Sequence, residues 1–540
     1  MCDPRPESLQ SEPQIHVVRV YLRDYFSIYH THKHKWWKIP PISVGHNYQG
    51  RVELSPLLEY WNFVETGSRS RSSKHEEGHG RLHLTDSRDT PRTIATQLPW
   101  CRTIFSIWDR NMLQNGTSIA DVPCPLSTFQ GDTRLMTGEI TDDAFGHLTE
   151  LTSLIIDGCS RRTITDTAFR HLTNLQSLDM SCCRQGTITD DAFRHLTSLQ
   201  SLNMIDCCQR EITDDAFRHL ANLQFLNMGL CVQETITDNA FRHLTNLQFL
   251  GMSACKQPTI TDDAFRYLTH LRSLDMSVCS QEKITDDAFR HLTKLQSLNM
   301  SRCRQRTITD NAFPHLTNLR SLNIAGCDQE TITDDAFRHL TNLRSLDMSG
   351  CRQRTITDDA FRSLTNLQAL DMSRCNQETI KGDDAFQYLA RLECLNMNVC
   401  DQTTIADSAF RHLTNLRSLD MSRCDQTTIT DNAFQYFSNL QYLEMYRCHQ
   451  QTITDAGFRH LTNLQSLKMG ECNQETITND TFRHLSNLKS LHMHGCNQET
   501  ITDDAFRHLA KLQFLDMCDC YQTTMTRDSF RYLTNVEVLK

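Results

Sequence analysis

The sequence has no long apolar run and no strong excess of charge of either sign. No stretch reaches the roughly 18–20 apolar residues that span a bilayer, and residues 1–13 lack a basic segment followed by an apolar core, so we expect no signal peptide. The 540 residues carry 55 Lys and Arg against 65 Asp and Glu, a formal net charge of −10. No basic excess indicates nucleic acid as a partner, and no acidic block forms a tail. We therefore expect a cytoplasmic or nuclear protein with no membrane span.

One unit is repeated through most of the chain. Residues 331–351 read TITDDAFRHLTNLRSLDMSGC, and near copies run from about residue 140 to the end. The phenylalanine of each unit recurs every 24 residues, except for a step of 25 between Phe361 and Phe386. We expect the extra residue, near Ile380 to Asp383, to bulge on a turn, because the core positions on both sides stay in phase. A unit this short cannot bury its own apolar face, so the period predicts a solenoid of stacked coils.

Each unit contains two kinds of spacing. From Phe193 to Leu199 the apolar residues have helical or 3₁₀ spacing, and at Leu202-x-Met204 the spacing falls to two, which is typical of a strand. Thr189, Asp190 and Asp191 precede the helical part, where an N-cap and a first turn favour such residues. Strands that repeat in one direction form a parallel sheet, roughly 80 Å along its stacking direction for seventeen coils.

The motif F-x2-L-x2-L-x2-L-x-M-x2-C, from Phe193 to Cys207, resembles the leucine-rich repeat. Its cysteine and the Ile-Thr-Asp string resemble the cysteine-containing subclass common in F-box proteins. Two positions depart from the family pattern, Met204 in place of the last strand leucine and Gln209 in place of the next apolar residue. The resemblance implies an α/β horseshoe of about 17 repeats over residues 136–540. Its parallel sheet lines the concave face, where such proteins bind partners, and its short helices or 3₁₀ turns lie on the convex face.

Sixteen cysteines form a ladder from Cys159 to Cys520, one in each coil but the last. Redox chemistry or metal binding is one interpretation, but packing is favoured, because a buried thiol behaves as a small hydrophobe with a weak S–H donor. Side chains stacked in register point the same way, so disulfides are not expected. Regular, unpaired cysteines fit a reducing compartment. Cysteines outside the ladder, such as Cys182, Cys208 and Cys518, are candidates for exposed thiols.

Three further side-chain types also recur. A glutamine follows most ladder cysteines by two residues, and stacked amides can bond from coil to coil. A histidine row from His171 to His508 is expected on the convex surface, as a solvated face rather than a metal or pH-sensing site, because nothing completes a four-ligand set. The Asp190–Asp191 pairs suggest calcium or carboxylate catalysis, but N-capping explains them better. We predict no metal, no cofactor and no catalytic set.

The coils that break the pattern are the best candidates for binding a protein partner, with random drift in a duplicated array as the alternative. Aromatic residues and arginine dominate interface hot spots. Neighbouring strands should place Glu444, Lys468, His492 and Asp516 in one row across the sheet. The main candidate, which we name the C-terminal cluster, comprises Tyr442, Glu444, Tyr446, Arg447, Lys468, Glu471, His492, His494, Phe514, Asp516 and Asp519. An accessory cluster comprises Phe225, Leu230 and Phe249.

Residues 1–135 lack the period and form a region of unknown fold, with disorder expected at about residues 66–92. The spacing of Ile15–Tyr29 predicts an amphipathic helix, and HTHKHKWWK at residues 30–38 is interpreted as a surface loop rather than a membrane or nucleic-acid site. Leu98-Pro99, followed by a predicted helix over Ile104–Leu113, faintly resembles an F-box. The sequence ends inside the seventeenth strand, so either a partner covers the last coil or the array stops early.

The leading hypothesis is a non-enzymatic scaffold that binds a protein partner on the concave face. The alternative is an F-box-like substrate receptor of a ubiquitin ligase, in which the repeats hold substrate and residues near 98–125 bind an adaptor. An extracellular receptor is disfavoured by the unpaired cysteine ladder.

Overall fold

The computed structural model describes residues 142–539, except 147, 157–163, 184–185, 208, 256, 304–305, 328–329, 352–354, 376–379, 381–383, 401–404, 425 and 534–535. Before residue 142 it describes the backbone of four short strands. Within these residues no helix is long and apolar enough to cross a bilayer.

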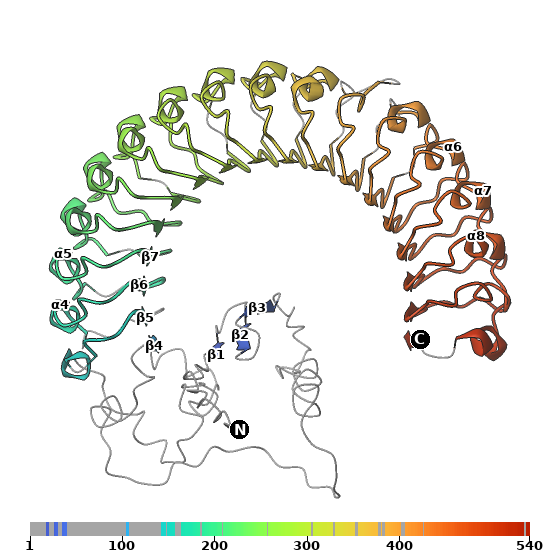
Figure 1. Ribbon diagram of the computed structural model, residues 1–540, viewed down its shortest axis with the longest axis horizontal. Coiled ribbons are helices and arrows are strands. Elements are labelled where there is room, and N and C mark those ends of the chain that lie inside the picture. Colours follow the sequence, from blue (N-terminus) through green and yellow to red (C-terminus); the bar gives the residue numbers. More distant parts are fainter. Residues whose placement is uncertain are drawn as a thin grey trace, which may run out of the picture.

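Each coil contributes one three-residue strand to a parallel sheet (Figure 1). These strands are β5 (Ser153–Ile155), β6 (Ser177–Asp179), β7 (Ser201–Asn203), β8 (Phe225–Asn227), β9 (Phe249–Gly251), β10 (Ser273–Asp275), β11 (Ser297–Asn299), β12 (Ser321–Asn323), β13 (Ser345–Asp347), β14 (Ala369–Asp371), β15 (Cys394–Asn396), β16 (Ser418–Asp420), β17 (Tyr442–Glu444), β18 (Ser466–Lys468), β19 (Ser490–His492), β20 (Phe514–Asp516) and β21 (Glu537–Leu539).

A short α-helix or 3₁₀ helix lies opposite the strand in most coils. They are η5 (Asp142–Phe145), α4 (Asp166–Phe169), α5 (Asp190–Phe193), η6 (Asp214–His219), η7 (Asp238–His243), η8 (Asp262–Tyr267), η9 (Asp286–Phe289), η10 (Asp310–Ala312), η11 (Asp334–Phe337), η12 (Asp358–Ser363), η13 (Asp407–Phe410), α6 (Asp431–Phe434), α7 (Asp455–Phe458), α8 (Asn479–Arg483) and η14 (Arg527–Tyr532).

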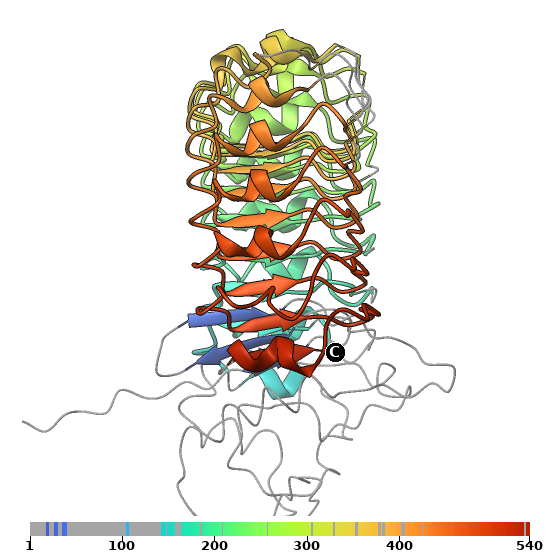
Figure 2. The ribbon, with the colours of Figure 1, turned by 90° about the vertical axis from the view of Figure 1, so that its right-hand side faces the viewer.

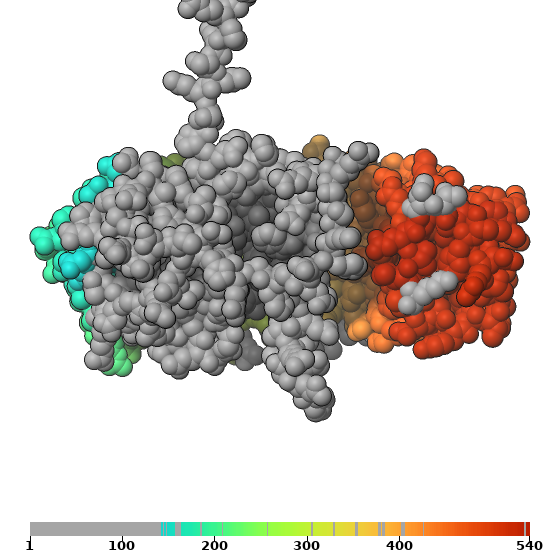
Figure 3. Space-filling view, turned by 90° about the horizontal axis from the view of Figure 1, so that it is seen from below, coloured from blue at the N-terminus to red at the C-terminus, as the bar shows by residue number. Residues whose placement is uncertain are grey.

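The strands pair in chain order and line the inside of an arc, with the helices on the outside (Figures 1 and 2). Figure 3, seen from below, shows the C-terminal coils in red as one end of the arc. Pairing in β10 and β11 joins Leu274 to Leu298, a step of one unit. The predicted solenoid, with its concave sheet and convex helical turns, is therefore confirmed.

The extra residue does not disturb the register. Leu370 pairs with Leu395 across it, and Ile380 and Phe386 on either side are buried. The core therefore stays in phase as predicted, while the bulge itself falls on residues outside the described part of the chain. The last strand is shifted by one residue, since Leu515 pairs with Val538.

The core is a stack of equivalent side chains, one layer for each coil. Phe289, Leu292, Leu295, Leu298 and Met300 of one coil are each 1% exposed or less. Their counterparts in neighbouring coils are equally buried, so the core is one continuous hydrophobic cluster. No coil has this core alone, which is why the coils must stack.

A carboxylate–threonine ladder joins successive helical turns. The carboxylate of Asp286 accepts two hydrogen bonds from Thr309 of the next coil, from its N–H and its hydroxyl, each 2.7 Å long. Thr285 caps its own helix by accepting the N–H of Asp287 at 3.3 Å. The N-cap is thus the threonine, and the prediction that the aspartate pairs act as caps was wrong in its assignment. The first aspartate holds the next coil instead.

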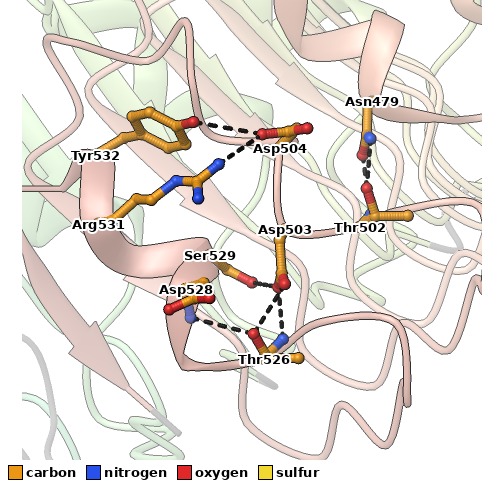
Figure 4. Close-up of polar contacts among 9 residues, drawn as sticks. All are labelled: Asn479, Thr502, Asp503, Asp504, Thr526, Asp528, Ser529, Arg531 and Tyr532. Atoms are coloured by element: carbon orange, nitrogen blue, oxygen red, sulfur yellow. Dashed lines mark hydrogen bonds and ion pairs between the residues drawn. The ribbon is translucent and has the colours of Figure 1, made fainter.

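The same ladder is visible in the last coils (Figure 4). Asp503 accepts the N–H of Thr526 at 2.6 Å, the hydroxyl of Thr526 at 2.8 Å and the hydroxyl of Ser529 at 2.5 Å. Asn479 replaces the first aspartate in its coil and still makes both bonds to Thr502, accepting its N–H at 2.9 Å and donating to its hydroxyl at 2.7 Å. Ala406, in contrast, stands at a cap position and makes no side-chain cap bond.

The cysteine ladder packs in the core and bonds between coils. Cys279 Sγ donates to the carbonyl of Met252 at 3.1 Å, and Cys375 Sγ donates to Met348 at 3.0 Å. No disulfide joins the described cysteines, and those of the ladder are buried except Cys520, which is partly exposed. Burial raises the pKa of the Cys279 and Cys375 thiols to about 12, so each remains a protonated donor. The packing interpretation is confirmed for these residues, while Cys159 and Cys208 lie outside the described part.

The glutamine row bonds to backbone carbonyls rather than forming a ladder of side-chain amides. Gln281 Nε2 donates to the backbone oxygen of Gln257 at 2.9 Å, and Gln474 Nε2 donates to that of Gln450 at 2.8 Å. The amide atoms of Gln257 and Gln450 are buried without a hydrogen-bond partner among the described residues. The row is structural, but direct side-chain amide pairing is not what the structure shows.

The strands before residue 142 correct three predictions. Val18–Val20 (β1), Phe26–His30 (β2) and Lys35–Ile39 (β3) form an antiparallel sheet, so the helix predicted over Ile15–Tyr29 and the loop at residues 30–38 are wrong at these positions. Alternation by two explains Val18, Val20, Phe26 and Ile28 as well as helical spacing does.

Ile104–Ser106 form β4, which pairs in parallel with β5. The prediction of an F-box helix over Ile104–Leu113 is therefore wrong at Ile104–Ser106. The rest of that motif and the segment at 66–92 lie outside the described residues, and the domain boundary at 136 stays a prediction.

Replacing the first aspartate of a pair should destabilise the fold far more than replacing the second. Asp286→Ala removes two bonds to a charged acceptor and should lower the free energy of unfolding by about 2–3 kcal/mol. Asp287→Ala removes only an exposed ion pair, 3.6 Å from Arg290, and should lower it by less than about 0.5 kcal/mol. Chemical denaturation of both variants checks this, and equal losses would contradict the ladder.

Stability should fall at alkaline pH because of the ladder thiols. An unfolded thiol ionises near about pH 8.5, whereas the folded pKa of Cys279 and Cys375 is about 12. The stabilisation from keeping these thiols protonated is therefore fully present below about pH 8.5. Above that pH the free energy of unfolding falls by roughly 1.4 kcal/mol per pH unit per thiol, until the pH reaches the pKa of the folded state. Denaturation from pH 8 to 11 should show a shallower fall in Cys279→Ala/Cys375→Ala than in the wild type. Cys182→Ala, which removes an exposed thiol, is the control, and equal slopes in all three proteins would exclude this origin.

Candidate functional site

The common residue at the third position of each strand serves the turn that follows it. Asp347 accepts the N–H of Ser349 at 3.0 Å, and Asn299 accepts that of Ser301 at 3.0 Å. The short carboxylate or amide reaches the backbone two residues on, as in an Asx turn. At most concave positions the carboxylates and amides therefore have a structural use.

Three adjacent strands have another residue in place of this turn-forming aspartate or asparagine. Glu444 of β17, Lys468 of β18 and His492 of β19 stand at the third position, in register with each other and with Asp516 of β20. Lys468 Nζ lies 2.5 Å from Glu444 Oε1, and His492 Nδ1 lies 3.7 Å from Asp516 Oδ2. The predicted row across the sheet is confirmed. Asp516 still closes its own turn by accepting the N–H of Cys518 at 3.1 Å, whereas the other three residues of the row contact side chains of neighbouring strands.

Tyr446 is the centre of a second set of contacts. Its ring stacks on that of His494, two coils away, with centroids 5.4 Å apart. Gly470 stands between them, and a Cβ there would meet the imidazole ring of His494. Because Gly470 has no side chain, the rings of Tyr446 and His494 can come into contact.

The Tyr446 hydroxyl donates to Glu471, which also accepts from Arg447 Nε at 2.6 Å. Hydrogen bonds from Arg447 and then Tyr446 lower the pKa of the Glu471 carboxyl, so it stays ionised. The Arg447 and Arg423 guanidinium carbons lie 5.1 and 5.6 Å from the Tyr446 ring centre. Rings, cations and one carboxylate therefore form a pre-arranged surface.

The remaining members of the C-terminal cluster lie around these contacts. Tyr442 is 48% exposed at the start of β17. Phe514 packs against His492, with ring centroids 4.8 Å apart. Asp519 is exposed, has a positive φ of 56° and lies 3.5 Å from the hydroxyl of Tyr521. The structure thus brings the members together on neighbouring strands and the turns that follow them.

The accessory cluster is separate, on β8, the turn that follows β8, and β9. Phe225 and Phe249 stack face to face, with centroids 4.4 Å apart and planes at 6°. Leu230 is 50% exposed. Sequence reasoning missed Val232 and Val278, each 52% exposed, and Tyr521, which is 76% exposed. The sequence could have indicated these three residues, because each is apolar or aromatic and lies outside the repeat's own apolar positions.

The structure also places a hydroxyl, an imidazole and a carboxylate together, which sequence reasoning excluded. Ser490 Oγ lies 3.1 Å from His492 Nε2, and the distance from His492 Nδ1 to Asp516, at 3.7 Å, exceeds that of a hydrogen bond. The N–H of Ser490 donates to Gln465 and that of Met493 to Asp516, so neither is available to stabilise an oxyanion. Ser490 also occupies a position that is serine in most coils.

Burial, and then Lys468, lower the pKa of His492, which favours the neutral ring. On the convex side, partial burial and then Arg194 lower the pKa of His195, which accepts the Nε–H of Arg194 at 2.9 Å. Histidines of the predicted convex row are exposed or partly exposed. Across the described residues, no three His, Cys, Asp or Glu side chains gather in a way that could hold a metal ion.

Comparison with known families identifies the repeat. A family model described as "BspA type Leucine rich repeat region" matches residues 258–393 and 403–537 in six copies, and a model described as "Leucine rich repeat" matches residues 149–207. The chain belongs to the leucine-rich-repeat family. No curated protein matches it.

Solved structures with the leucine-rich-repeat fold superpose on most of the chain. An LRR protein of Leptospira interrogans has 19% identity and a TM-score of 0.57, covering 71% of this chain and 95% of its own. The TLR13–ssRNA13 complex has 22% identity and a TM-score of 0.53, covering 78% of this chain and 67% of the other. Toll of Drosophila, in complex with Spatzle, has 19% identity and a TM-score of 0.55, covering 71% and 53%. These likenesses show the fold.

Ser490 should not react as a catalytic nucleophile, because it lacks oxyanion donors and a bonded histidine–carboxylate pair. Wild type and Ser490→Ala should show the same background labelling by a fluorophosphonate probe, measured by mass spectrometry of the peptide containing residue 490. Labelling of Ser490 that is lost in His492→Gln would contradict this conclusion.

Proposed function

We propose that this leucine-rich-repeat protein is a non-enzymatic scaffold that binds a protein partner through the C-terminal cluster on its concave face. The observation that carries the proposal is that Glu444, Lys468 and His492 replace the turn-forming residue on three adjacent strands, beside the aromatic rings of the cluster. Those side chains do not serve their own coils and instead form one laterally connected surface.

The chemistry of this surface suits a protein interface. Tyrosine and arginine supply large, partly rigid contact areas and dominate hot spots. The contacts of Tyr446 with His494 and Glu471 hold the side chains in place before binding, which reduces the entropy lost on association. Among solved structures of this fold, one is the complex of Toll with Spatzle.

The same contacts favour a binding role over catalysis. Lys468 and Arg447 are engaged with carboxylates, and His492 faces a carboxylate beyond hydrogen-bond distance. The ubiquitin-ligase alternative relied on a helix where the structure has β4. Recovery of ligase adaptor subunits with the wild-type protein would restore that alternative.

Truncating the two aromatic anchors should weaken partner capture without unfolding the protein. Tyr446→Ala/Phe514→Ala should raise the dissociation constant of the captured partner at least roughly 30-fold, which corresponds to about 2 kcal/mol. Quantitative affinity capture from cell lysate, followed by titration of the recovered partner, measures this.

Tyr267→Ala is the matched control, because Tyr267 lies on the convex side and is 40% exposed. It should leave capture unchanged, and thermal unfolding should be the same in both variants. Equal capture by the wild type and by the double variant would rule out the C-terminal cluster as the binding site.

A further inference from the structure

A stripe of positive charge runs along the edge where the strands begin. The residue just before each strand is glutamine in most coils, namely Gln176, Gln200, Gln224, Gln248, Gln296, Gln368, Gln441, Gln465 and Gln513. Between β10 and β16 it becomes arginine four times, and a second position two residues earlier adds two more cations. We define the basic stripe as Arg272, Lys294, Arg320, Arg344, Arg391 and Arg417, all exposed.

The backbone aligns these residues in space. The N–H of Arg344 donates to the carbonyl of Arg320 at 2.8 Å, and that of Arg320 donates to Gln296 at 2.7 Å. Equivalent positions of successive coils are therefore direct neighbours along the edge. Glu393 is the one carboxylate at these two positions in the seven coils, although the whole chain carries a net charge of −10.

Most residues of the stripe form no ion pair with a described residue, whereas several arginines on the convex side do. On the convex side Arg266 lies 3.6 Å from Asp263 of its own coil, and Arg290 lies 3.6 Å from Asp287. On the stripe Arg417 lies 3.5 Å from Glu393. Arg272, Lys294, Arg320 and Arg344 form no ion pair with a described residue. Uncompensated charge of one sign in a row attracts a ligand of the opposite sign.

Polar grooves lie at both ends of the stripe. One of about 480 Å³ is lined by Gln248, Arg272 and Lys294 among others, and one of about 540 Å³ is lined by Arg417, Asn415 and Asn439 among others. The asparagine amides at their base donate to the preceding coil, as Asn415 Nδ2 does to Ala390 at 2.8 Å. The grooves therefore offer cations and amides on a polar base, not an apolar pocket.

The dimensions fit an extended chain. Six strand spacings from β10 to β16 amount to roughly 29 Å, which about nine residues of extended peptide span. Stacking on aromatic rings is how single-stranded nucleic acids are held, and the residues of the stripe and the two grooves include no Phe, Tyr or Trp.

We propose that the basic stripe binds an extended acidic segment of a partner protein, about nine residues long, with its carboxylates on the guanidinium and ammonium groups. This inference rests on the proposed function only in taking the ligand to be a protein, since it concerns a different surface from the C-terminal cluster.

The test uses full-length protein and a fluorescein-labelled peptide of about nine residues with alternating glutamates, measured by fluorescence anisotropy at low and physiological salt. The stripe variant is Arg272→Gln/Arg320→Gln/Arg344→Gln/Arg417→Gln, which restores the residue of the other coils. Its matched control with the same charge change is Arg218→Gln/Arg266→Gln/Arg290→Gln/Arg338→Gln on the convex side.

The wild type should bind the peptide, more weakly at higher salt. The stripe variant should bind at least roughly tenfold more weakly, and the convex control should match the wild type within about twofold. Equal losses in both variants, or no peptide binding by the wild type, would overturn the proposal. So would a single-stranded RNA of similar length that binds more tightly than the peptide and is lost in the stripe variant.

Tyr446→Ala/Phe514→Ala should bind the acidic peptide as well as the wild type does. Normal peptide binding with lost partner capture, or the reverse, separates the failure of one proposal from the failure of the other.

Discussion

Every feature of the repeat array depends on contacts between adjacent coils, because a 24-residue unit has no core of its own. Strand pairing, the thiol bonds such as that of Cys279 to Met252, and the carboxylate–threonine ladder each join one coil to the next. A residue in the common pattern therefore serves its neighbour as much as its own coil. This explains why the pattern varies so little along the array, and why the missing cap bond at Ala406 is an exception.

The same constraint limits where a specific surface can arise. Positions that stack coils cannot change without loss of stability, so specificity is left to positions whose side chains the coil does not need. At β17–β19 even the turn-forming residue is given up, and Glu444, Lys468 and His492 are stabilised by lateral contacts instead. Along the strand-starting edge, arginine in place of glutamine alters charge without altering packing. The two surfaces thus arise from different departures within one scaffold.

Much of the fold could be predicted from the 24-residue period and the spacing of apolar residues within each unit. The spacing at Leu202 and Met204 predicted the strand, and the step from unit to unit predicted the row from Glu444 to Asp516, because in-register stacking follows from equal unit length. Contacts that depend on the angle and separation between coils could not be predicted from the sequence. Asp286 reaching Thr309, and Gln281 reaching a backbone carbonyl, depend on that geometry. The approach of Ser490 to His492 depends on a rotamer, which no spacing encodes. Near the N-terminus, the spacing of apolar residues in 15–29 was compatible with a helix and with strands, and the structure has strands.

Common residues build the array, and we propose that the departures at its C-terminal coils bind the partner. The most direct measurement is the affinity of the captured partner for a variant in which those departures are returned to the residues of the other coils. That variant is Tyr442→Ser, Glu444→Asp, Tyr446→Ser, Lys468→Asp, His492→Asp and His494→Ser. Its free energy of unfolding should equal or exceed that of the wild type, since the turn-forming side chains return, and it should no longer bind the partner. Partner binding of unchanged affinity in a folded variant would contradict this proposal.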